Sequence, residues 1–290
     1  MELNNLLFPA PESSYSEETF PGELIWIPRS GNSKLPPIPC LYLSCTRGSS
    51  KVMLYFHGNA EDIGLAYELM DHIRSTLLVH VIAVEYPGYG LYAGESTAEQ
   101  VILDSQDIMN FLVSQMGLSS RNILVFGRSI GSGPATWLAA NMNPGAMLLM
   151  SAYTSIRSVV KTIAGSWAAF LVKERFNNLD LMPRVTCPSF FIHGQLDNLI
   201  PFNNSQQLHE ACSGPCSLIL PKDMDHNEFD FFDDLSLPFS AFLMQCGISV
   251  NPESMHTAFI NFPPGIFTPP STEKNRNKGT WNKFFKHFST

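Results

Sequence analysis

A serine stands between two glycines in residues 127–131, whose sequence is Gly-Arg-Ser-Ile-Gly. The apolar run 122–126, with its β-branched residues, precedes this motif and predicts a buried strand. Residues 130–143, rich in Ala and Leu, predict a helix that follows it and ends before Pro144. A strand, a tight turn with serine at its apex and a helix together form a nucleophile elbow. Because such a turn exposes the hydroxyl, we expect Ser129 to be a catalytic nucleophile.

A serine hydroxyl is a poor nucleophile at neutral pH and needs a general base. His226 is the candidate base, since it comes just after the last predicted strand, residues 217–220. The base in turn needs an acid that orients its ring and stabilises the imidazolium. Asp197 is the candidate acid, because it follows the preceding predicted strand, residues 190–193. The three residues occur in the chain order Ser, Asp, His.

Three other aspartates are alternatives for the acid, namely Asp180, Asp223 and Asp225. Asp223 and Asp225 lie too close in sequence to His226 to approach its far nitrogen easily, so they are expected to cap or solvate the loop. Asp197 is therefore preferred over all three.

Backbone amides near the serine are expected to form an oxyanion hole. The predicted donors are the amides of Asn59, which lies between a strand and a helix, and of Ile130, with the amide of Ala60 as the alternative to Asn59. His57, two residues before Asn59, is interpreted as a structural imidazole bonded to loop carbonyls rather than as a catalytic group.

Two further features near the motif have alternative interpretations. Residues 86–90, Tyr-Pro-Gly-Tyr-Gly, favour a rigid turn over a set of rings at the acyl site. Arg128, inside the elbow, either holds a loop through a carboxylate or points to solvent, and the sequence does not choose between these.

Strands and helices alternate along the rest of the chain. Strands are predicted at 23–28 and 38–44, as a hairpin, and at 52–56, 79–84, 122–126, 146–150, 190–193 and 217–220; helices are predicted at 61–77, 97–116, 130–143, 206–212 and 231–245, with a mixed helical stretch at 151–182. This alternation predicts an α/β fold with a mostly parallel central sheet flanked by helices. In such sheets ligands bind beyond the carboxyl ends of the strands, where His57, Ser129, Asp197 and His226 all fall.

Composition limits the classes of function. Hydrophobic residues make up 44% and charged residues 15% of the 290 residues, which is enough apolar material for a buried core. A net charge of −8 argues against nucleic acid as a partner, since a phosphate backbone requires a basic face. No long apolar run or basic leader predicts a membrane span or a signal peptide. The six cysteines include no pair spaced as in zinc sites, so we expect reduced thiols and a cytoplasmic protein.

Three segments are expected along the chain: an extended lead-in over residues 1–22, one α/β domain over 23–248, and a tail over 249–290 that is first Pro-rich and then basic and aromatic. Within the domain, a small helical cap is predicted between residues 155 and 181. The tail residues 272–290 combine five cations with four large aromatic rings, which suits peripheral contact with an anionic membrane at its cytoplasmic face. Packing of the rings onto the domain, and a disordered tail, are the alternatives.

Taken together, these motifs resemble the α/β-hydrolase superfamily over roughly residues 20–245. The branch that the chain is most similar to comprises the α/β-hydrolase-domain-containing depalmitoylases (acyl-protein thioesterases) and the Bem46-like serine hydrolases. The matching residues are 56–62 (FHGNAED), 85–90 (EYPGYG), 127–131 (GRSIG), His193-Gly194 with Asp197 and Ile200-Pro201, and 225–227 (DHN).

The resemblance implies an α/β-hydrolase fold and a serine thioesterase or esterase that acts on fatty-acylated substrates through an acyl-enzyme. Removal of palmitoyl groups from protein cysteines is the specific activity that the depalmitoylase branch suggests, and an acylated protein or a lipid-like small molecule is the substrate class. By position, Ser129, Asp197 and His226 match the nucleophile, acid and base. Such a mechanism uses no metal or organic cofactor.

One departure separates this chain from that branch. The depalmitoylases carry an N-terminal cluster of acylated cysteines, whereas residues 1–39 here contain none, and Cys40 and Cys45 fall in or beside a predicted strand. The alternative functions are a general carboxylesterase or serine peptidase of the same fold, and a non-catalytic binding protein that retains it. The complete Ser, Asp and His set argues against the last.

Overall fold

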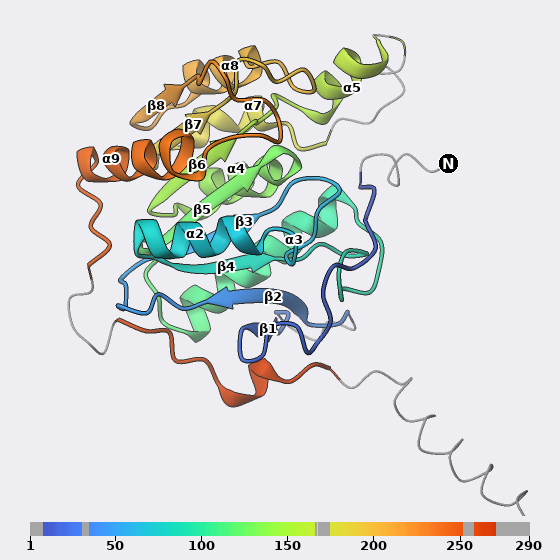
Figure 1. The fold of residues 1–290 in the computed structure, drawn as a ribbon, viewed down its shortest axis with the longest axis vertical. Coiled ribbons are helices and arrows are strands. Elements are labelled where there is room, and N and C mark those ends of the chain that lie inside the picture. The colour runs from blue at the N-terminus through green and yellow to red at the C-terminus, as the bar shows by residue number, and fades with distance from the viewer. Residues whose placement is uncertain (1–7, 31–34, 166, 168–174, 252–257, 271–290) are drawn as a thin grey trace, which may run out of the picture.

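An eight-stranded sheet runs through the protein, in the order β1-β2-β4-β3-β5-β6-β7-β8 (Figure 1). The computed structural model describes residues 8–30, 35–165, 167, 175–251 and 258–270. The strands are β1 (Leu24–Ile27), β2 (Ile38–Leu43), β3 (Val52–Phe56), β4 (His80–Val84), β5 (Ile123–Arg128), β6 (Ala146–Met150), β7 (Ser189–Ile192) and β8 (Cys216–Ile219). β1 pairs with β2 and β2 with β4 in antiparallel fashion, and all other pairs are parallel. The predicted hairpin and mostly parallel sheet are confirmed.

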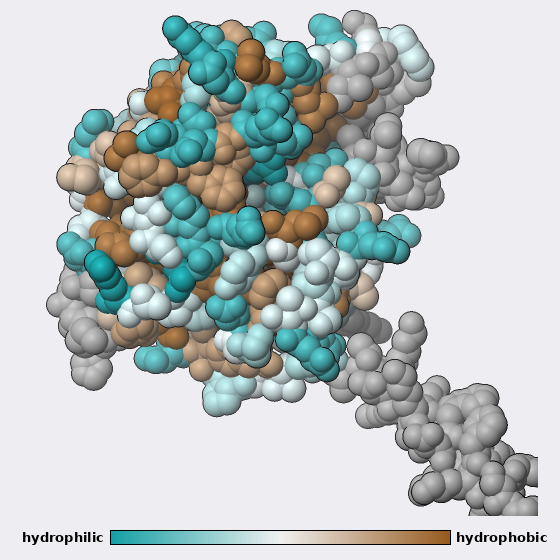
Figure 2. All heavy atoms as spheres, viewed as in Figure 1, coloured by the Kyte–Doolittle hydropathy of each residue, from teal (hydrophilic) through white to brown (hydrophobic). Residues whose placement is uncertain are grey.

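Helices cover both faces of this sheet, which is why the strands from β1 to β7 are buried along their whole length. α2 (Tyr67–Leu77) and α9 (Leu237–Gln245) pack on one face, and α3 (Ala98–Asn110), α4 (Ser132–Met142) and α8 (Asn203–Ala211) on the other. Side chains that alternate along each strand therefore enter two separate apolar cores. On the face seen in Figure 2, apolar side chains are interspersed with polar ones.

The register of the central strands brings the ends of three strands to one edge. Phe56 at the end of β3 pairs with Val84 at the end of β4 and with Gly127 near the end of β5. The residues that follow, beginning with His57 and Glu85, therefore start from neighbouring positions at the carboxyl edge of the sheet.

Several helix boundaries differ from the prediction. α2 begins at Tyr67 rather than at residue 61, because residues 61–66 form a turn in which the Asp62 side chain accepts a hydrogen bond from the Leu65 amide. α3 ends at Asn110 and continues as a single π-helical turn, Phe111–Gln115. A second π-helical turn, Phe231–Ser236, precedes α9.

The segments that flank the sheet pack against opposite ends of it. In the N-terminal segment, residues 8–22, Phe8 and Tyr15 are buried although the segment has no helix or strand. At the other end of the chain, Ala258 is buried and its carbonyl accepts hydrogen bonds from the Ser49 amide and from His80 Nε2. Phe262 packs edge-on against Tyr42. Both segments belong to the folded body rather than extending from it.

The predicted cap and tail are described only in part. α5 (Ile156–Ala164) and the short α7 (Asn178–Leu181) lie within the predicted cap, but residues 166 and 168–174 are outside the described residues. The basic and aromatic residues 272–290 also lie outside them. In the described part of the chain, no helix is both long and apolar enough to cross a bilayer. Within those same ranges, no group of three or more His, Cys, Asp or Glu side chains could hold a metal ion.

Candidate active site

Ser129 follows β5 directly and has a left-handed backbone, with φ of +51°. A single turn of 3₁₀-helix, Ser129–Gly131, joins it to α4. A Cβ at position 127 would collide with the carbonyl of Gly131, and one at position 131 would collide with the carbonyl of Phe56. Glycine is therefore required on both sides of the serine, and the strained turn has the form of a nucleophile elbow.

The three residues of the predicted triad meet at this point. His226 Nε2 lies 3.1 Å from Ser129 Oγ, and His226 Nδ1 lies 2.7 Å from Asp197 Oδ2. Each residue comes from a different loop at the carboxyl edge: Ser129 after β5, Asp197 after β7 and His226 after β8. The carboxylate fixes the tautomer with the proton on Nδ1, which leaves Nε2 free to accept the serine proton.

Asp197 is buried but well supplied with donors. Its Oδ1 accepts hydrogen bonds from the amides of Leu199 and Ile200, at 2.9 and 2.8 Å. Burial raises the pKa of Asp197, but hydrogen bonds from His193 and His226 and from the Ile200 amide outweigh it and lower the pKa below its usual value. The carboxylate therefore stays ionised wherever the site would operate.

The competing aspartates do not reach the histidine. Asp180 is exposed and bonds to Asn177, and Asp223 is exposed. Asp225 caps its own loop, since its Oδ1 accepts from the Asn227 and Glu228 amides, both at 2.7 Å. The prediction that Asp225 caps the loop is confirmed.

The loop between β3 and α2, residues 57–66 (hereafter the β3–α2 loop), carries the predicted oxyanion donor Asn59. Among the described residues no hydrogen bond is formed by the Asn59 amide, whereas the Ala60 amide donates to Asn59 Oδ1 at 3.2 Å. Ile130 lies at the start of the helix, where amide groups lack helical acceptors. Both predicted donors are thus on the segments that flank the serine, and their catalytic role stays a prediction.

Arg128 joins this loop to the histidine loop. Its Nη1 forms an ion pair with Glu61 Oε2 at 3.0 Å, and its Nη2 donates to the carbonyl of His226 and to Asn227 Oδ1, both at 3.1 Å. Glu61 also accepts from the Gly58 amide at 2.6 Å. Of the two alternatives for Arg128, the one in which it holds a loop through a carboxylate is correct.

His57 is fully buried and structural, as predicted, although one of its partners was not foreseen. Its Nδ1 bonds to the carbonyl of Gly58 at 2.8 Å, and its Nε2 bonds to the carboxylate of Glu85 at 3.0 Å. The rigid turn predicted for residues 86–90 is also confirmed. Tyr86 and Tyr89 are buried there, and their hydroxyls donate to the His57 carbonyl and to Asn59 Oδ1, each at 2.9 Å.

Two side chains of this site were missed by the sequence reasoning as functional elements. His193 Nε2 lies 3.2 Å from Asp197 Oδ2, and this contact helps to lower the pKa of Asp197. Glu85 lies beneath the β3–α2 loop. Both residues directly follow strands, β7 and β4, and that position could have marked them.

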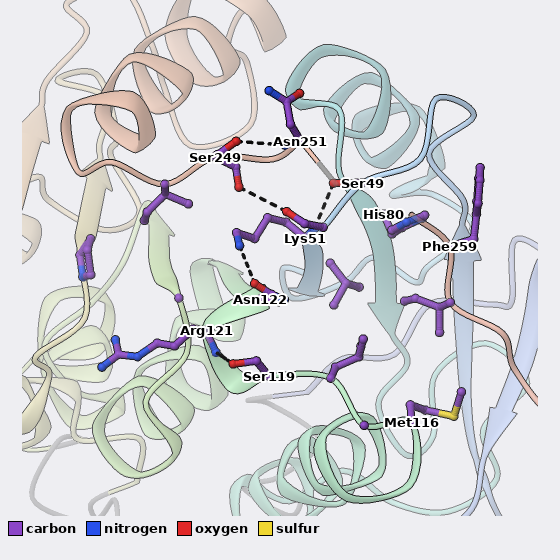
Figure 3. Close-up of a pocket in the computed structure, with 18 of the residues that line it drawn as sticks. Ser49, Lys51, His80, Met116, Ser119, Arg121, Asn122, Ser249, Asn251 and Phe259 are labelled. Carbon is purple, nitrogen blue, oxygen red and sulfur yellow. Dashed lines mark hydrogen bonds between the residues drawn. The ribbon is translucent and has the colours of Figure 1, made fainter. Parts of the chain in front are cut away.

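A cavity of about 820 Å³ lies at the opposite end of the sheet (Figure 3). Its lining includes Lys51, His80 and Asn122, at the amino ends of β3, β4 and β5. The cavity is therefore remote from Ser129 and does not form part of the candidate site.

Comparisons with known proteins agree with this geometry. A family model described as "Serine hydrolase (FSH1)" matches residues 89–227. The human "Alpha/beta hydrolase domain-containing protein 17B" is 28% identical over 200 residues, which cover 69% of this chain and 68% of the relative. The frog (Xenopus laevis) "Alpha/beta hydrolase domain-containing protein 17C" is 25% identical over 193 residues, which cover 67% of this chain and 61% of that relative.

Among solved structures, the esterase Pf2001 of Pyrococcus furiosus superposes with a TM-score of 0.64 at 19% identity, covering 82% of this chain and 98% of that one. Est1E of Butyrivibrio proteoclasticus gives a TM-score of 0.62 at 13% identity, covering 79% of this chain and all of the other. These likenesses establish the fold. With the sheet and the elbow, they show that the chain has the α/β-hydrolase fold. In sequence the chain is similar to the serine hydrolase family model and to the two relatives named above.

Proposed function

We propose that this protein is a thioesterase or esterase of fatty-acylated substrates, and that its natural reaction is removal of palmitoyl-type acyl groups from protein cysteines. The observation that carries the catalytic part is the continuous hydrogen-bonded chain from Ser129 through His226 to Asp197. The substrate class rests on the resemblance to the depalmitoylase branch. The sequence similarity to the relatives named 17B and 17C is consistent with this resemblance.

In the first step, His226 takes the proton of Ser129 as Oγ attacks the thioester or ester carbonyl. The C–O bond to Ser129 forms while the carbonyl oxygen becomes an oxyanion. The amides of Asn59 and Ile130 donate hydrogen bonds to this oxyanion. The tetrahedral intermediate then collapses, and the thiol or alcohol leaves with the proton from His226. Asp197 holds the ring and stabilises its positive charge throughout.

In the second step, water attacks the acyl group on Ser129. His226 accepts a proton from the water and returns it to Ser129 Oγ as the acid product leaves. Arg128 supports both steps, because it fixes the backbone of the loop that carries His226.

Labelling with a fluorophosphonate probe tests the nucleophile. We expect the wild type to label and Ser129→Ala to remain unlabelled, with hydrolysis reduced by at least about 10⁴-fold. Ser151→Ala is a matched control, because Ser151 also directly follows a strand and has a φ of +50°. Unlike Ser129, its buried hydroxyl has no hydrogen-bond partner among the described residues, and therefore no base. The control should label like the wild type.

The substrate class is tested with acyl thioesters and oxygen esters from acetyl to palmitoyl, together with peptide amides. Preference for long-chain thioesters supports the proposal, whereas preference for short esters favours a general carboxylesterase. Cleavage of peptide amides alone favours a peptidase. A folded wild type that neither labels nor hydrolyses any of these compounds contradicts the proposed function and favours a binding protein.

A further inference from the structure

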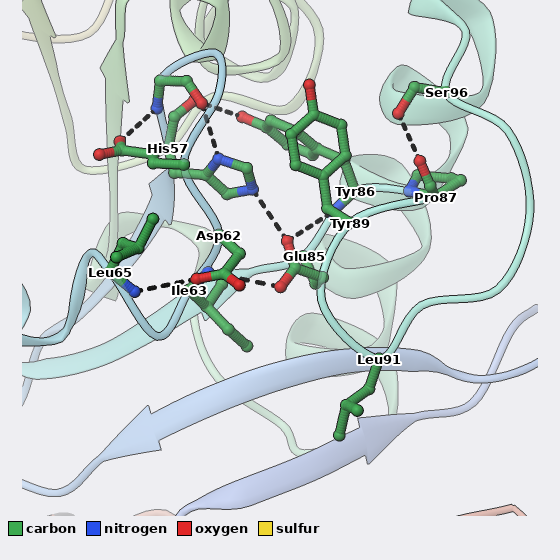
Figure 4. A network of polar contacts seen from close by, with 12 residues as sticks. His57, Asp62, Ile63, Leu65, Glu85, Tyr86, Pro87, Tyr89, Leu91 and Ser96 are labelled. Atoms are coloured by element: carbon green, nitrogen blue, oxygen red, sulfur yellow. Dashed lines mark hydrogen bonds and ion pairs between the residues drawn. The ribbon is translucent and has the colours of Figure 1, made fainter. Parts of the chain in front are cut away.

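The buried carboxylate of Glu85 is the centre of a polar network beneath the β3–α2 loop (Figure 4). It accepts hydrogen bonds from His57 Nε2 at 3.0 Å, from the hydroxyl of Tyr15 at 2.8 Å and from the Ile63 amide at 3.3 Å. The carboxylate thus joins the start of the loop, at His57, and its interior, at Ile63, to the N-terminal segment. The mechanism proposed above does not use Glu85.

The partners of His57 indicate that its ring is positively charged. One nitrogen faces the carbonyl of Gly58 and the other faces the carboxylate of Glu85, and both of these groups can only accept from it. A ring with two acceptors must carry protons on both nitrogens. Burial lowers the pKa of His57, but the hydrogen bond and charge of Glu85 outweigh this and raise it above its usual value. His57 and Glu85 therefore form a buried ion pair beneath the β3–α2 loop.

The N-terminal segment contacts this ion pair through Tyr15. The Tyr15 hydroxyl donates to Glu85 and also accepts a hydrogen bond from the Leu91 amide at 3.3 Å. Burial, reinforced by the charge of Glu85, raises the pKa of Tyr15, so the hydroxyl remains a donor. A Cβ on Gly90, whose φ is +49°, would collide with Glu85 and Tyr15, so the close approach of these two side chains requires glycine there.

A second contact fastens the same segment to the same loop. The backbone amide of Ser14 donates to Asp62 Oδ2 at 2.7 Å, and the Ser14 hydroxyl donates to Asp62 Oδ1. Asp62 is fully buried and also holds the start of the turn that leads to α2. Two adjacent residues of the N-terminal segment, Ser14 and Tyr15, thus bind two carboxylates: Asp62 within the loop that carries Asn59, and Glu85 beneath it.

We propose that Tyr15 and Glu85 are positioning residues for the reaction: the N-terminal segment fastens the β3–α2 loop through them, so that the Asn59 amide points at the developing oxyanion. This inference rests on the proposed function for its catalytic consequence. It assigns to Ser14 and Tyr15 a place in the catalytic apparatus, although they lie far from Ser129 in sequence and belong to a segment without regular structure.

The test compares Tyr15→Phe with Tyr42→Phe in the full-length chain. Tyr42 is an equally buried tyrosine whose hydroxyl bonds to His80 at the other end of the sheet. Tyr42→Phe therefore also removes the hydrogen bond of a buried tyrosine, here to a neutral ring, without contacting the β3–α2 loop. For Tyr15→Phe we expect kcat to fall about tenfold with KM unchanged, as for loss of one hydrogen bond to a charged group. Tyr42→Phe should leave kcat unchanged.

A second readout does not depend on the substrate. Amide hydrogen exchange of residues 58–65 should be about tenfold faster in Tyr15→Phe than in wild type or Tyr42→Phe. Glu85→Gln should lower kcat further and speed amide exchange in the loop further than Tyr15→Phe does. In this variant, ¹⁵N spectra should show the His57 ring in its neutral form, whereas the wild-type ring is doubly protonated.

Each outcome decides one part of the inference. Unchanged exchange in Tyr15→Phe overturns the fastening of the loop. Faster exchange with unchanged kcat overturns the positioning role, as does an equal loss of kcat in Tyr42→Phe. If the wild type hydrolyses no ester or thioester, the proposed function fails on its own, and hydrogen exchange still decides whether the N-terminal segment holds the loop.

Discussion

His57 and His80 are both buried and lie at opposite ends of neighbouring strands, but their surroundings differ in kind. His57, after β3, faces only acceptors, including the carboxylate of Glu85. His80, at the start of β4, accepts a hydrogen bond from the Cys45 amide at Nδ1 and donates from Nε2 to the carbonyl of Ala258 (Figure 3 shows its position). A donor on one side and an acceptor on the other match a neutral ring.

The same contrast holds for the two ends of the sheet. At the carboxyl end, carboxylates, histidines and an arginine are buried together, namely Asp62, Glu85, Asp197, His57, His193 and Arg128. At the amino end, the buried polar groups Ser49 and His80 bond mainly to backbone. Buried charge is costly to maintain. Its concentration at one end of the sheet agrees with the active site proposed there. If that proposal is correct, substitutions at the two ends should separate activity from stability.

The largest effect is expected for Asp197→Asn. The amide cannot hold the Nδ1–H tautomer of His226, so kcat should fall by about 10⁴-fold while the fold is retained. Steady-state hydrolysis of the preferred substrate measures this. Ser49→Ala, which removes a buried hydroxyl that donates to the Val250 carbonyl at the amino end, should lower thermal stability and leave kcat intact. Comparable losses of kcat in both variants would contradict the distinction between the carboxyl and amino ends of the sheet.

A smaller effect is expected for Arg128→Lys. A lysine keeps the charge but cannot contact Glu61 and the His226 carbonyl together, so kcat should fall about tenfold through a less rigid histidine loop. Arg29→Lys is the matched control, since Arg29 is also buried and pairs with Asp104 at 2.7 Å, outside the site. Kinetics and thermal unfolding of both variants separate the roles: both should lose stability, and only the first should lose activity. Full activity in Arg128→Lys would contradict the role given to this arginine.

The smallest effects concern the dependence of stability on pH. The raised pKa of His57 means that its contribution to stability is complete below about pH 6.5 and is lost as the pH rises through its native pKa. Burial lowers the pKa of His80, so its contribution is complete above about pH 6.5 and is lost as the pH falls toward its native pKa.

Thermal unfolding of His57→Gln and His80→Gln between pH 5 and 9 tests these opposite signs. Relative to wild type, His57→Gln should flatten the decline of the midpoint above pH 7, and His80→Gln should flatten the decline below pH 7. For each kcal/mol of unfolding free energy that a histidine contributes, the midpoint temperature should shift by about 2–4 °C. The two wild-type rings, followed by ¹⁵N NMR, provide a check if either variant does not fold. Matching pH profiles for the two variants would remove the distinction between the histidines.

The sequence was sufficient for the features that depend on local pattern. The strands 52–56 and 146–150 have the predicted limits, because continuous apolar runs bounded by polar residues mark buried parallel strands. The elbow could be recognised because glycine is required at both flanks of Ser129. Parallel topology then places Asp197 and His226 at the same edge as Ser129, where their side chains meet.

What the sequence did not reveal depends on contacts between distant segments. Nothing local to Tyr15 or Glu85 indicates that they bond to each other. The lead-in was expected to be extended, and its sequence does not reveal that Phe8 and Tyr15 are buried. The late start of α2 has the same origin, since Asp62 is held by Ser14 from another part of the chain. Such polar contacts leave no periodic signal, because each involves a single side chain.

The hydrogen bond between His226 and Ser129 spans 97 residues of chain, and this has a consequence for synthesis. At about 5–20 residues per second, the ribosome would add the histidine roughly 5–20 s after the serine. During this interval the nascent chain carries Ser129 in a motif that no base can activate. If Ser129 is the nucleophile and His226 the base, as proposed, the serine stays unreactive until the last strand of the sheet, β8, and the loop after it have been made.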